Sequence, residues 1–307
     1  MTVVDRRELA SDIVEFTLNR ADGGAVAPWA PGAHVDLHLP GVGVRQYSLC
    51  GDPDDRCHYR VAVLRESSGR GGSAYLHDRV APGATLDVSA PRNNFPLVPA
   101  SRYVFVAGGI GITPLLPMIE DATARGADWQ LWFGGRTRRS MAYTDRLLVH
   151  GERVRIVPQD RDGLLPLAEI LAAGAPGTRV YCCGPEPLLA AAEALAGTGV
   201  LHVERFAPRA SDDADDGSDR AFTVRLARSG LTLDVGSDES ILDVLERAGV
   251  APMTSCRAGT CASCETTVLE GSVLHRDSVL TAVEKDAGTS MMVCVSRAYG
   301  DLVVLDL

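Results

Sequence analysis

Four cysteines near the end of the 307-residue chain constrain its fold more than any other feature of the sequence. Cys256, Cys261 and Cys264 follow one another with the spacing C-x4-C-x2-C, and Cys294 comes from a separate segment. This is the ligand spacing of a plant-type [2Fe–2S] cluster, in which one tight loop supplies three thiolates. The small residues between the ligands let backbone N–H groups approach the sulfur atoms. The spacing therefore predicts a cluster-binding domain.

Two other interpretations of the four thiols stay open on the residues alone. Structural zinc sites also use four cysteines, although they usually pair two short hooks. Here three cysteines share one loop and the fourth stands apart. Cysteine also packs in protein cores as a small apolar residue, without any metal. The cluster is favoured because neither alternative accounts for the intervals between the cysteines.

Composition and charge exclude several classes of protein. The net charge is −10, and most of the excess acidic residues come after residue 208, which disfavours nucleic-acid binding. An acidic cluster domain could steer towards a basic partner, or the charge could serve solubility alone. No apolar run is long enough to cross a bilayer, and residues 1–10 lack a secretory signal. The other cysteines form no disulfide-like framework, so we expect a reducing cytoplasm.

Residues 1–98 read as short strands separated by turns, at 13–18, 34–39, 45–50 and 58–64. Many short strands in such a stretch predict a closed antiparallel β-barrel. Arg45 offers a forked donor for phosphate, and Tyr47 offers a flat face for an aromatic ring. Strand alternation puts Arg45 and Tyr47 on one side and Ser48 on the other. Alone, this motif is a weak signal.

A glycine-rich segment with Gly71, Gly72 and Ser73 follows, and a helical run starts there. Glycines and a serine at the start of a helix suit an anion, because backbone N–H groups converge there. The alternative is a flexible hairpin loop. Together with Arg45, the segment favours a flavin that carries a phosphate.

Residues 99–208 change to alternating strands and helices, which predicts a parallel sheet covered on both faces. The buried strand 103–107 leads into a turn with Gly109, Gly111, Thr113 and Pro114, with Pro114 expected in the first turn of a helix. This arrangement is typical of a dinucleotide-phosphate loop, although its G-x-G-x-x-P pattern departs from the Rossmann fingerprint. Ligands of such sheets bind at the carboxyl ends of the strands. Arg136 and the segment Cys183, Gly184, Pro185 are expected there.

The last part of the chain has two sections. Residues 209–219 are rich in aspartate and small residues, so they are predicted to be a linker. Residues 220–307 combine a hairpin at 222–235, a helix at 240–248 and further strands around the cysteine loop. This order predicts a β-grasp ferredoxin domain. The fold class is therefore a flavin barrel, an α/β nucleotide domain and an α+β ferredoxin domain.

Taken in order, these motifs resemble those of the phthalate dioxygenase reductase and vanillate demethylase reductase family, within the ferredoxin–NADP reductase superfamily. The resemblance covers nearly the whole chain and uses the barrel motif, both glycine segments, the Cys-Gly-Pro segment and the four cysteines. It implies FMN on the barrel, held by Arg45, Tyr47, Ser48, Val63, Gly71, Gly72 and Ser73. It implies a pyridine nucleotide on Gly109, Gly111, Thr113, Pro114, Arg136, Gly184 and Pro185. Ser48, Cys183 and Phe206 would lie at the reacting ring.

The resemblance also implies the activity. NADH delivers two electrons as one hydride and a [2Fe–2S] cluster accepts one at a time, so FMN must stand between them. The expected route is NADH to FMN to cluster to a terminal oxygenase, most simply a Rieske non-haem iron oxygenase. Arginines at 136, 138 and 139 leave NADPH open. Other readings are a reductase that serves a cytochrome P450, a stand-alone electron carrier, and a zinc-binding interaction protein.

Overall fold

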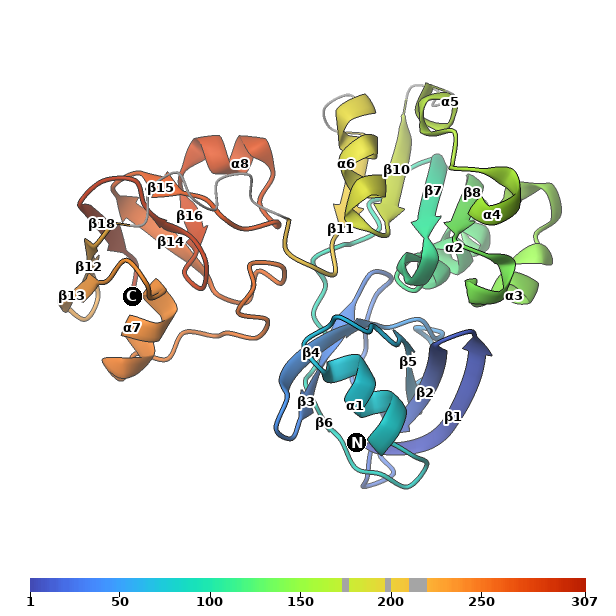
Figure 1. Cartoon of the computed structure of the whole chain (residues 1–307), viewed down its shortest axis with the longest axis horizontal. Coiled ribbons are helices and arrows are strands. Elements are labelled where there is room, and N and C mark those ends of the chain that lie inside the picture. Colours follow the sequence, from blue (N-terminus) through green and yellow to red (C-terminus); the bar gives the residue numbers. More distant parts are fainter. Residues whose placement is uncertain (173–176, 197–199, 210–219) are drawn as a thin grey trace. The chain divides into compact units, whose positions relative to one another are not determined.

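The computed structural model describes residues 1–172, 177–196, 200–209 and 220–307 (Figure 1). The chain divides into two compact units, Met1–Glu204 and Arg205–Leu307. The first unit holds an antiparallel barrel and a parallel sheet, and the second holds a smaller mixed sheet. Nearly all of the predicted acidic linker lies outside the described residues. None of the described helices has the length and apolar character that crossing a bilayer requires.

The barrel consists of two three-stranded antiparallel sheets. One has the order β1-β2-β5 and the other the order β4-β3-β6. Their strands are β1 Thr2–Ala10, β2 Ile13–Asn19, β3 His34–Leu39, β4 Gly43–Ser48, β5 His58–Leu64 and β6 Asp87–Val88. Bridges between Leu49 and Val61 and between Thr2 and Thr85 join the two sheets. Helix α1 (Gly72–Arg79) packs on the barrel core through the buried Leu76.

The parallel sheet of the first unit has the strand order β11-β10-β7-β8-β9. Its strands are β7 Arg102–Gly108, β8 Asp128–Gly135, β9 Val154–Pro158, β10 Thr178–Cys183 and β11 Leu201–Glu204. Every pairing in this sheet is parallel. Strand β7 is buried on both sides, with Phe105 in one apolar cluster and Val104 and Val106 in another. A parallel sheet needs such cover because its helical crossovers lie on its faces.

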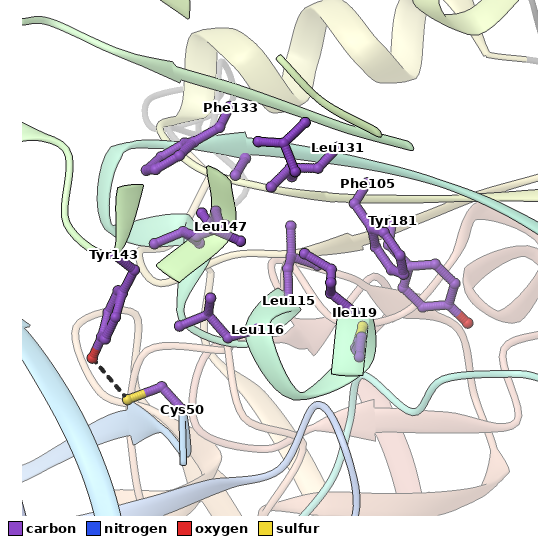
Figure 2. Close-up of a cluster of buried hydrophobic side chains, with 14 of the residues drawn as sticks. Cys50, Phe105, Leu115, Leu116, Ile119, Leu131, Phe133, Tyr143, Leu147 and Tyr181 are labelled. Carbon is purple, nitrogen blue, oxygen red and sulfur yellow. Dashed lines mark hydrogen bonds between the residues drawn. The ribbon is translucent and has the colours of Figure 1, made fainter. Parts of the chain in front are cut away.

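Helices cover both faces of this sheet. Helix α2 (Leu115–Ala124) and the short α3 (Thr144–Leu148) pack on the Phe105 side, as Figure 2 shows for Leu115, Leu116 and Leu147. Helices α5 (Leu167–Ala172) and α6 (Glu186–Leu195) pack on the opposite side. The remaining helical segments are η1 Gly109–Ile112, η2 Arg138–Ser140, η3 Gly151–Arg153 and α4 Gln159–Asp162.

Helix α3 is short and starts directly after Tyr143, which takes a left-handed backbone conformation. One local prediction about this sheet was wrong. Pro114 is the N-cap residue of α2 and does not lie in its first turn, because η1 intervenes between the strand and the helix. Pro114 still suits the site, since a proline lacks the N–H that an uncapped helix start would leave without a partner.

The barrel and the parallel sheet share one apolar core. The cluster that contains Phe105 and α2 also contains Ile13, Cys50 and Ala62 from the barrel strands and their ends. Figure 2 shows Cys50 beside this cluster, with its sulfur directed at Tyr143. The two halves of the first unit are therefore packed together by burial of apolar side chains from both.

The second unit is the predicted β-grasp arrangement. Its main sheet has the order β13-β12-β18-β14-β16 and combines parallel and antiparallel pairings. The strands are β12 Phe222–Leu226, β13 Thr232–Val235, β14 Glu265–Glu270, β15 Val273–Leu274, β16 Ser290–Met292, β17 Arg297–Ala298 and β18 Leu302–Leu305. Helix α7 (Ile241–Arg247) starts at a capping box in which Ser240 accepts from the Asp243 N–H, and it buries Leu245 in the core. Helix α8 spans Ala282–Ala287.

Candidate functional site

The barrel carries a site for an anion where β4 meets the start of α1. Arg45 lies on β4, and one guanidinium nitrogen donates to the Arg70 carbonyl at 2.6 Å. A Cβ atom at Gly72 would come within 2.5 Å of Arg45 Cγ, so only glycine lets the arginine lie there. Burial and the nearby Arg70 charge both lower the pKa of Arg45. Two neighbouring cations beside a helix start suit a phosphate.

The neighbours of Arg45 complete this cradle. Gly71 has φ +82°, a left-handed conformation that side chains disfavour, and it caps α1. Ser73 accepts a hydrogen bond from the Glu66 N–H at 3.0 Å, which fixes its hydroxyl at the helix start. Tyr47 follows on the same side of β4 and is half-buried. Val63 lies on β5 inside the barrel's own core, where its side chain is almost fully buried.

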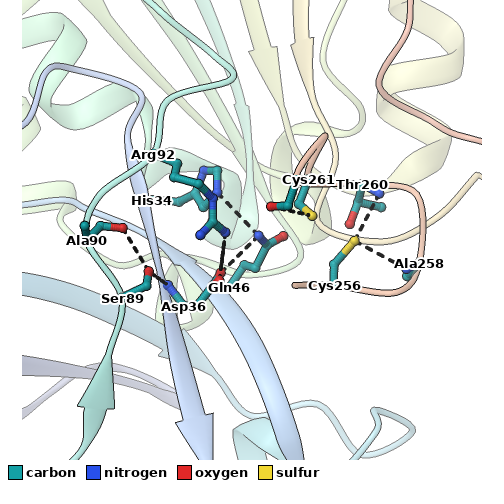
Figure 3. Close-up of polar contacts among 11 residues, drawn as sticks. His34, Asp36, Gln46, Ser89, Ala90, Arg92, Cys256, Ala258, Thr260 and Cys261 are labelled. Carbon is teal, nitrogen blue, oxygen red and sulfur yellow. Dashed lines mark hydrogen bonds and ion pairs between the residues drawn. The ribbon is translucent and has the colours of Figure 1, made fainter. Parts of the chain in front are cut away.

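The opposite side of β4 is held by buried polar contacts. Arg92 forms two hydrogen bonds with the carboxylate of Asp36, at 2.7 and 2.8 Å, and Gln46 donates to the same carboxylate at 3.1 Å (Figure 3). Asp36 is almost fully buried on β3, opposite Gln46. A buried carboxylate with an arginine partner is costly to displace. These contacts therefore fix the orientation of the strand that carries Arg45, Tyr47 and Ser48.

The parallel sheet brings its glycine turn against the Cys-Gly-Pro segment. A Cβ atom at Gly111 would overlap the backbone carbonyl of Cys183, and one at Gly108 would lie 2.7 Å from Pro185 Cδ. These two segments follow β7 and β10, which are neighbours in the sheet. The glycines thus permit a close approach of two backbones at the carboxyl edge, where α/β sheets bind ligands.

The rest of the predicted nucleotide loop lies at this edge too. Gly109 has φ +55° directly after β7. Thr113 is buried, and its hydroxyl donates to the Ile110 carbonyl at 3.0 Å, so it stabilises the turn itself. Arg136 follows β8 and is exposed, and its carbonyl accepts from the Asp160 N–H at 3.1 Å. This backbone contact joins the end of β8 to α4.

Glu204 is a site residue that the sequence did not reveal. It ends β11, directly opposite Cys183 at the end of β10. Its Oε2 atom lies 3.5 Å from Ser48 Oγ and 4.0 Å from Cys183 Sγ. The structure thus brings together two predicted residues, Ser48 and Cys183, around a carboxyl group. The sequence signal was only that Glu204 ends the last strand of the domain.

Burial controls the electrostatics of this group. It raises the pKa of Glu204 to about 8, opposed by the hydrogen bond from Ser48. It also raises the pKa of the Cys183 thiol, and the nearby Glu204 adds to that effect. At neutral pH, Glu204 is therefore mainly a protonated acid, and Cys183 is a neutral thiol that shields the site. Such a carboxyl group can donate or accept a proton near physiological pH.

Phe206 falls at the start of the second unit, two residues beyond Glu204. Its side chain is 46% exposed. Its position over a flavin stays a prediction, because it does not belong to the group that the first unit assembles.

The cysteine loop of the second unit has a backbone suited to wrapping sulfur. Arg257, Gly259 and Ala262 all have positive φ, at 51°, 66° and 54°. This turns N–H groups inward: those of Ala258 and Thr260 donate to Cys256 Sγ at 3.3 and 3.4 Å (Figure 3). Non-glycine residues rarely adopt this conformation, and where they do, a functional constraint usually holds them.

All four predicted ligands are buried. Hydrogen bonds with Cys261 and Cys294 lower the pKa of Cys256, and the same contacts raise the pKa of Cys261 and of Cys294. Among the residues that the structure describes, no three His, Cys, Asp or Glu side chains converge as a set of metal-ion ligands. The fit to a cluster therefore rests on the ligand spacing, the inward N–H groups and the burial of all four thiols.

Comparison with known proteins agrees with this geometry. Residues 224–299 match the family model of the 2Fe-2S iron-sulfur cluster binding domain. The phenoxybenzoate dioxygenase subunit beta of Ectopseudomonas oleovorans is 42% identical over 304 residues, which cover 97% of this chain and 94% of that protein.

Solved structures match the whole chain as well. The structure of phthalate dioxygenase reductase, described as a modular structure for electron transfer from pyridine nucleotides to [2Fe-2S], is 36% identical with a TM-score of 0.72, and 97% of it is covered. An intact type IV self-sufficient cytochrome P450 monooxygenase is 44% identical with a TM-score of 0.91. This chain spans only 40% of the length of that P450 protein.

Proposed function

The chain belongs to the phthalate dioxygenase reductase family, and from this premise we propose that it is the reductase component of a multicomponent oxygenase or demethylase. The observation that carries the proposal is the contact between Ser48 and Glu204. This contact connects β4, the barrel strand that carries Arg45 of the anion site, to the carboxyl edge of the nucleotide sheet. A flavin and a pyridine nucleotide bound at these two places would meet at that contact.

The residues present fit the expected groups. Arg45, Gly71, Gly72 and Ser73 would hold the phosphate of FMN, with Tyr47 and Ser48 beside its ring and Val63 behind it. Cys256, Cys261, Cys264 and Cys294 would hold the [2Fe–2S] cluster. When bound, FMN converts the electron pair of a hydride into single electrons that the cluster can carry. We propose functional domains at 1–98, 99–208 and 220–307, joined by the linker 209–219.

The nucleotide would bind along the carboxyl edge of the parallel sheet. Gly109, Gly111, Thr113 and Pro114 would face its pyrophosphate, while Cys183, Gly184 and Pro185 would shape the nicotinamide pocket. We propose NADH as the donor. The Asp160 N–H donates to the Arg136 carbonyl. We propose that the Asp160 carboxylate faces the ribose hydroxyl, which an acidic residue suits better than a 2′-phosphate. Arg136 keeps NADPH as the alternative to be tested.

The protein itself handles protons and water at the meeting point. Glu204 is held protonated near neutral pH by burial, and its Oε2 atom accepts a hydrogen bond from the Ser48 hydroxyl at 3.5 Å, which orients that hydroxyl. Cys183 is fully buried against this pair and excludes water. Phe206 is proposed to cover the ring face. No nucleophile is required, because positioning and electrostatics are the protein's contribution to hydride transfer.

Replacement of Cys261 by Ser tests the order of the centres. The variant should lose NADH-dependent reduction of cytochrome c, which accepts single electrons from the cluster, but keep reduction of ferricyanide, which the flavin can reduce directly. Cys57→Ser is the matched control, since Cys57 is exposed and lies outside both sites. Equal loss of both activities in Cys261→Ser would contradict the proposed order.

We propose a Rieske non-haem iron oxygenase as the electron acceptor. Relatives named as subunits of dioxygenase and demethylase systems support this. A cytochrome P450 is the second candidate, favoured by the match to a self-sufficient P450 monooxygenase. Co-purification from the native host separates them by the spectrum of the captured oxygenase. We propose a cytoplasmic location, because a cluster held by four thiolates suits a reducing compartment.

A further inference from the structure

Tyr143 has a strained backbone at a place where nothing local explains it. Its φ is +62°, in the left-handed region, and it stands directly before α3. Glycine and asparagine tolerate this conformation, whereas a bulky residue there is an outlier. Such strain persists where the surrounding structure determines it, often at functional positions. Contacts with other parts of the chain must therefore hold Tyr143 in this conformation.

The Tyr143 side chain is held by two buried groups from the barrel. Its hydroxyl donates to Glu15 Oε2 at 2.7 Å. Cys50 Sγ lies 3.2 Å from the Tyr143 hydroxyl oxygen (Figure 2). Arg7 donates to the other carboxylate oxygen of Glu15 at 2.9 Å. Glu15 and Tyr143 are 4% and 8% exposed, and Cys50 is fully buried. A buried carboxylate that accepts hydrogen bonds on both oxygens is held firmly in one position.

Both barrel residues lie next to the proposed flavin site. Glu15 pairs with Ala62, beside the Val14–Val63 pair of the same ladder. Cys50 comes two residues after Ser48. Tyr143, by contrast, belongs to the nucleotide-binding half and follows the segment of Arg136. A movement of Tyr143 relative to Glu15 would therefore move the nucleotide edge relative to the flavin strands.

A backbone contact supports the same connection. The Ser11 N–H, in the turn between β1 and β2, donates to the Arg139 carbonyl at 2.9 Å. The barrel thus holds this segment at two points, at Arg139 within η2 and at Tyr143 after it. A buried ionic group often contributes little net free energy of folding. Its better established effect is to favour one packing arrangement of the chain over the alternatives.

We propose that Glu15 and Tyr143 form a positioning clamp, which sets the nucleotide-binding half against the barrel so that nicotinamide meets the flavin ring at reacting distance. The purpose of the clamp rests on the proposed function, but the contact between Glu15 and Tyr143 can be tested without any substrate. The variants are Tyr143→Phe, which removes only the hydroxyl, and Glu15→Gln, which removes the charge. Tyr59→Phe is the matched control, because the buried Tyr59 hydroxyl donates to Ala27 within the barrel alone.

The first measurement is the rate at which a maleimide labels Cys50 in the folded protein, located by mass spectrometry. Exposed Cys57 serves as the internal standard. Both clamp variants should label Cys50 about tenfold faster than wild type, since a lost hydrogen bond to a charged group opens the contact by that order. Tyr59→Phe should label Cys50 at the wild-type rate.

The second measurement is stopped-flow reduction of the flavin by NADH, expressed per bound FMN. The clamp variants should show a rate constant at saturating NADH that is about tenfold lower, with an apparent Kd within about twofold of wild type, because misplacement affects the reaction more than binding. Wild-type labelling of Cys50 in both variants, or an unchanged rate constant per bound flavin, would overturn the proposal. If NADH fails to reduce even the wild-type protein, the proposed function falls, while the labelling still decides the clamp.

Discussion

Glu204 Oε2 lies 3.5 Å from Ser48 Oγ, although 156 residues separate them in the chain. Ser48 ends a barrel strand, and Glu204 ends a strand of the parallel sheet. The contact therefore brings the barrel and the parallel sheet of the first unit together at a carboxyl group that can hold a proton. Several consequences of the proposed site can be measured.

The first prediction concerns the pH dependence of stability. Glu204 has its pKa raised from 4.5 to about 8, so between these values the native state holds a proton that the unfolded state has released. The free energy of unfolding that Glu204 contributes therefore falls as pH rises through this window. Glu204→Gln, which cannot ionise, should lose less thermal stability than wild type between about pH 5 and pH 8, by a few degrees in Tm. Parallel Tm curves for the two proteins would contradict the burial of this carboxyl group.

The second prediction concerns flavin retention. Arg45→Gln should weaken FMN binding by about 10- to 100-fold, the usual worth of a charge-assisted hydrogen bond to phosphate. Fluorescence titration of the apoprotein with FMN measures this. Arg20→Gln is the control, because Arg20 pairs with Asp22 on the barrel surface. Comparable affinities in the two variants would show that the phosphate binds elsewhere.

The third prediction concerns the close approach of the two loops at the nucleotide edge. Gly111→Ala should cost about 2 kcal/mol or more in unfolding free energy, because its Cβ would overlap a backbone carbonyl that cannot rotate away. It should also raise the KM for NADH. Gly300→Ala, where no heavy atom lies within 4 Å of the added Cβ, should stay within about 0.5 kcal/mol of wild type. Denaturant unfolding of both variants decides the point, and a neutral Gly111→Ala would refute it.

The fourth prediction separates the two units chemically. Cys294→Ser should lower the iron content sharply while leaving FMN bound, since the anion site and the cysteine loop belong to different units. Iron assay and flavin absorbance on the same sample give both quantities. Loss of FMN together with iron would mean that the units do not fold and bind independently.

Much of the architecture could be predicted because it depends on local patterns. Strands β3 and β5 begin and end where their apolar patterns and turn residues predict. The cysteine spacing and the order of the motifs also identified the family, which the comparisons confirm. Each of these features is determined by residues that lie close together in the sequence.

The rest depends on contacts between distant segments. Glu204 joins the site only because β11 lies beside β10 and a barrel strand ends at Ser48. Tyr143 takes a left-handed backbone conformation before α3, and its hydroxyl reaches Glu15, 128 residues away. Local helix propensity carries no information about such a contact, so tertiary structure overrides it.

The central claim is that one chain holds a flavin and a [2Fe–2S] cluster that NADH can reduce. The most direct measurement is the visible spectrum of the purified, anaerobically reconstituted protein during titration with NADH. The account predicts one FMN and one cluster per chain, with the absorption bands of both bleached by NADH. A protein that retains neither flavin nor iron, or that retains both without any bleaching by NADH or NADPH, would contradict it.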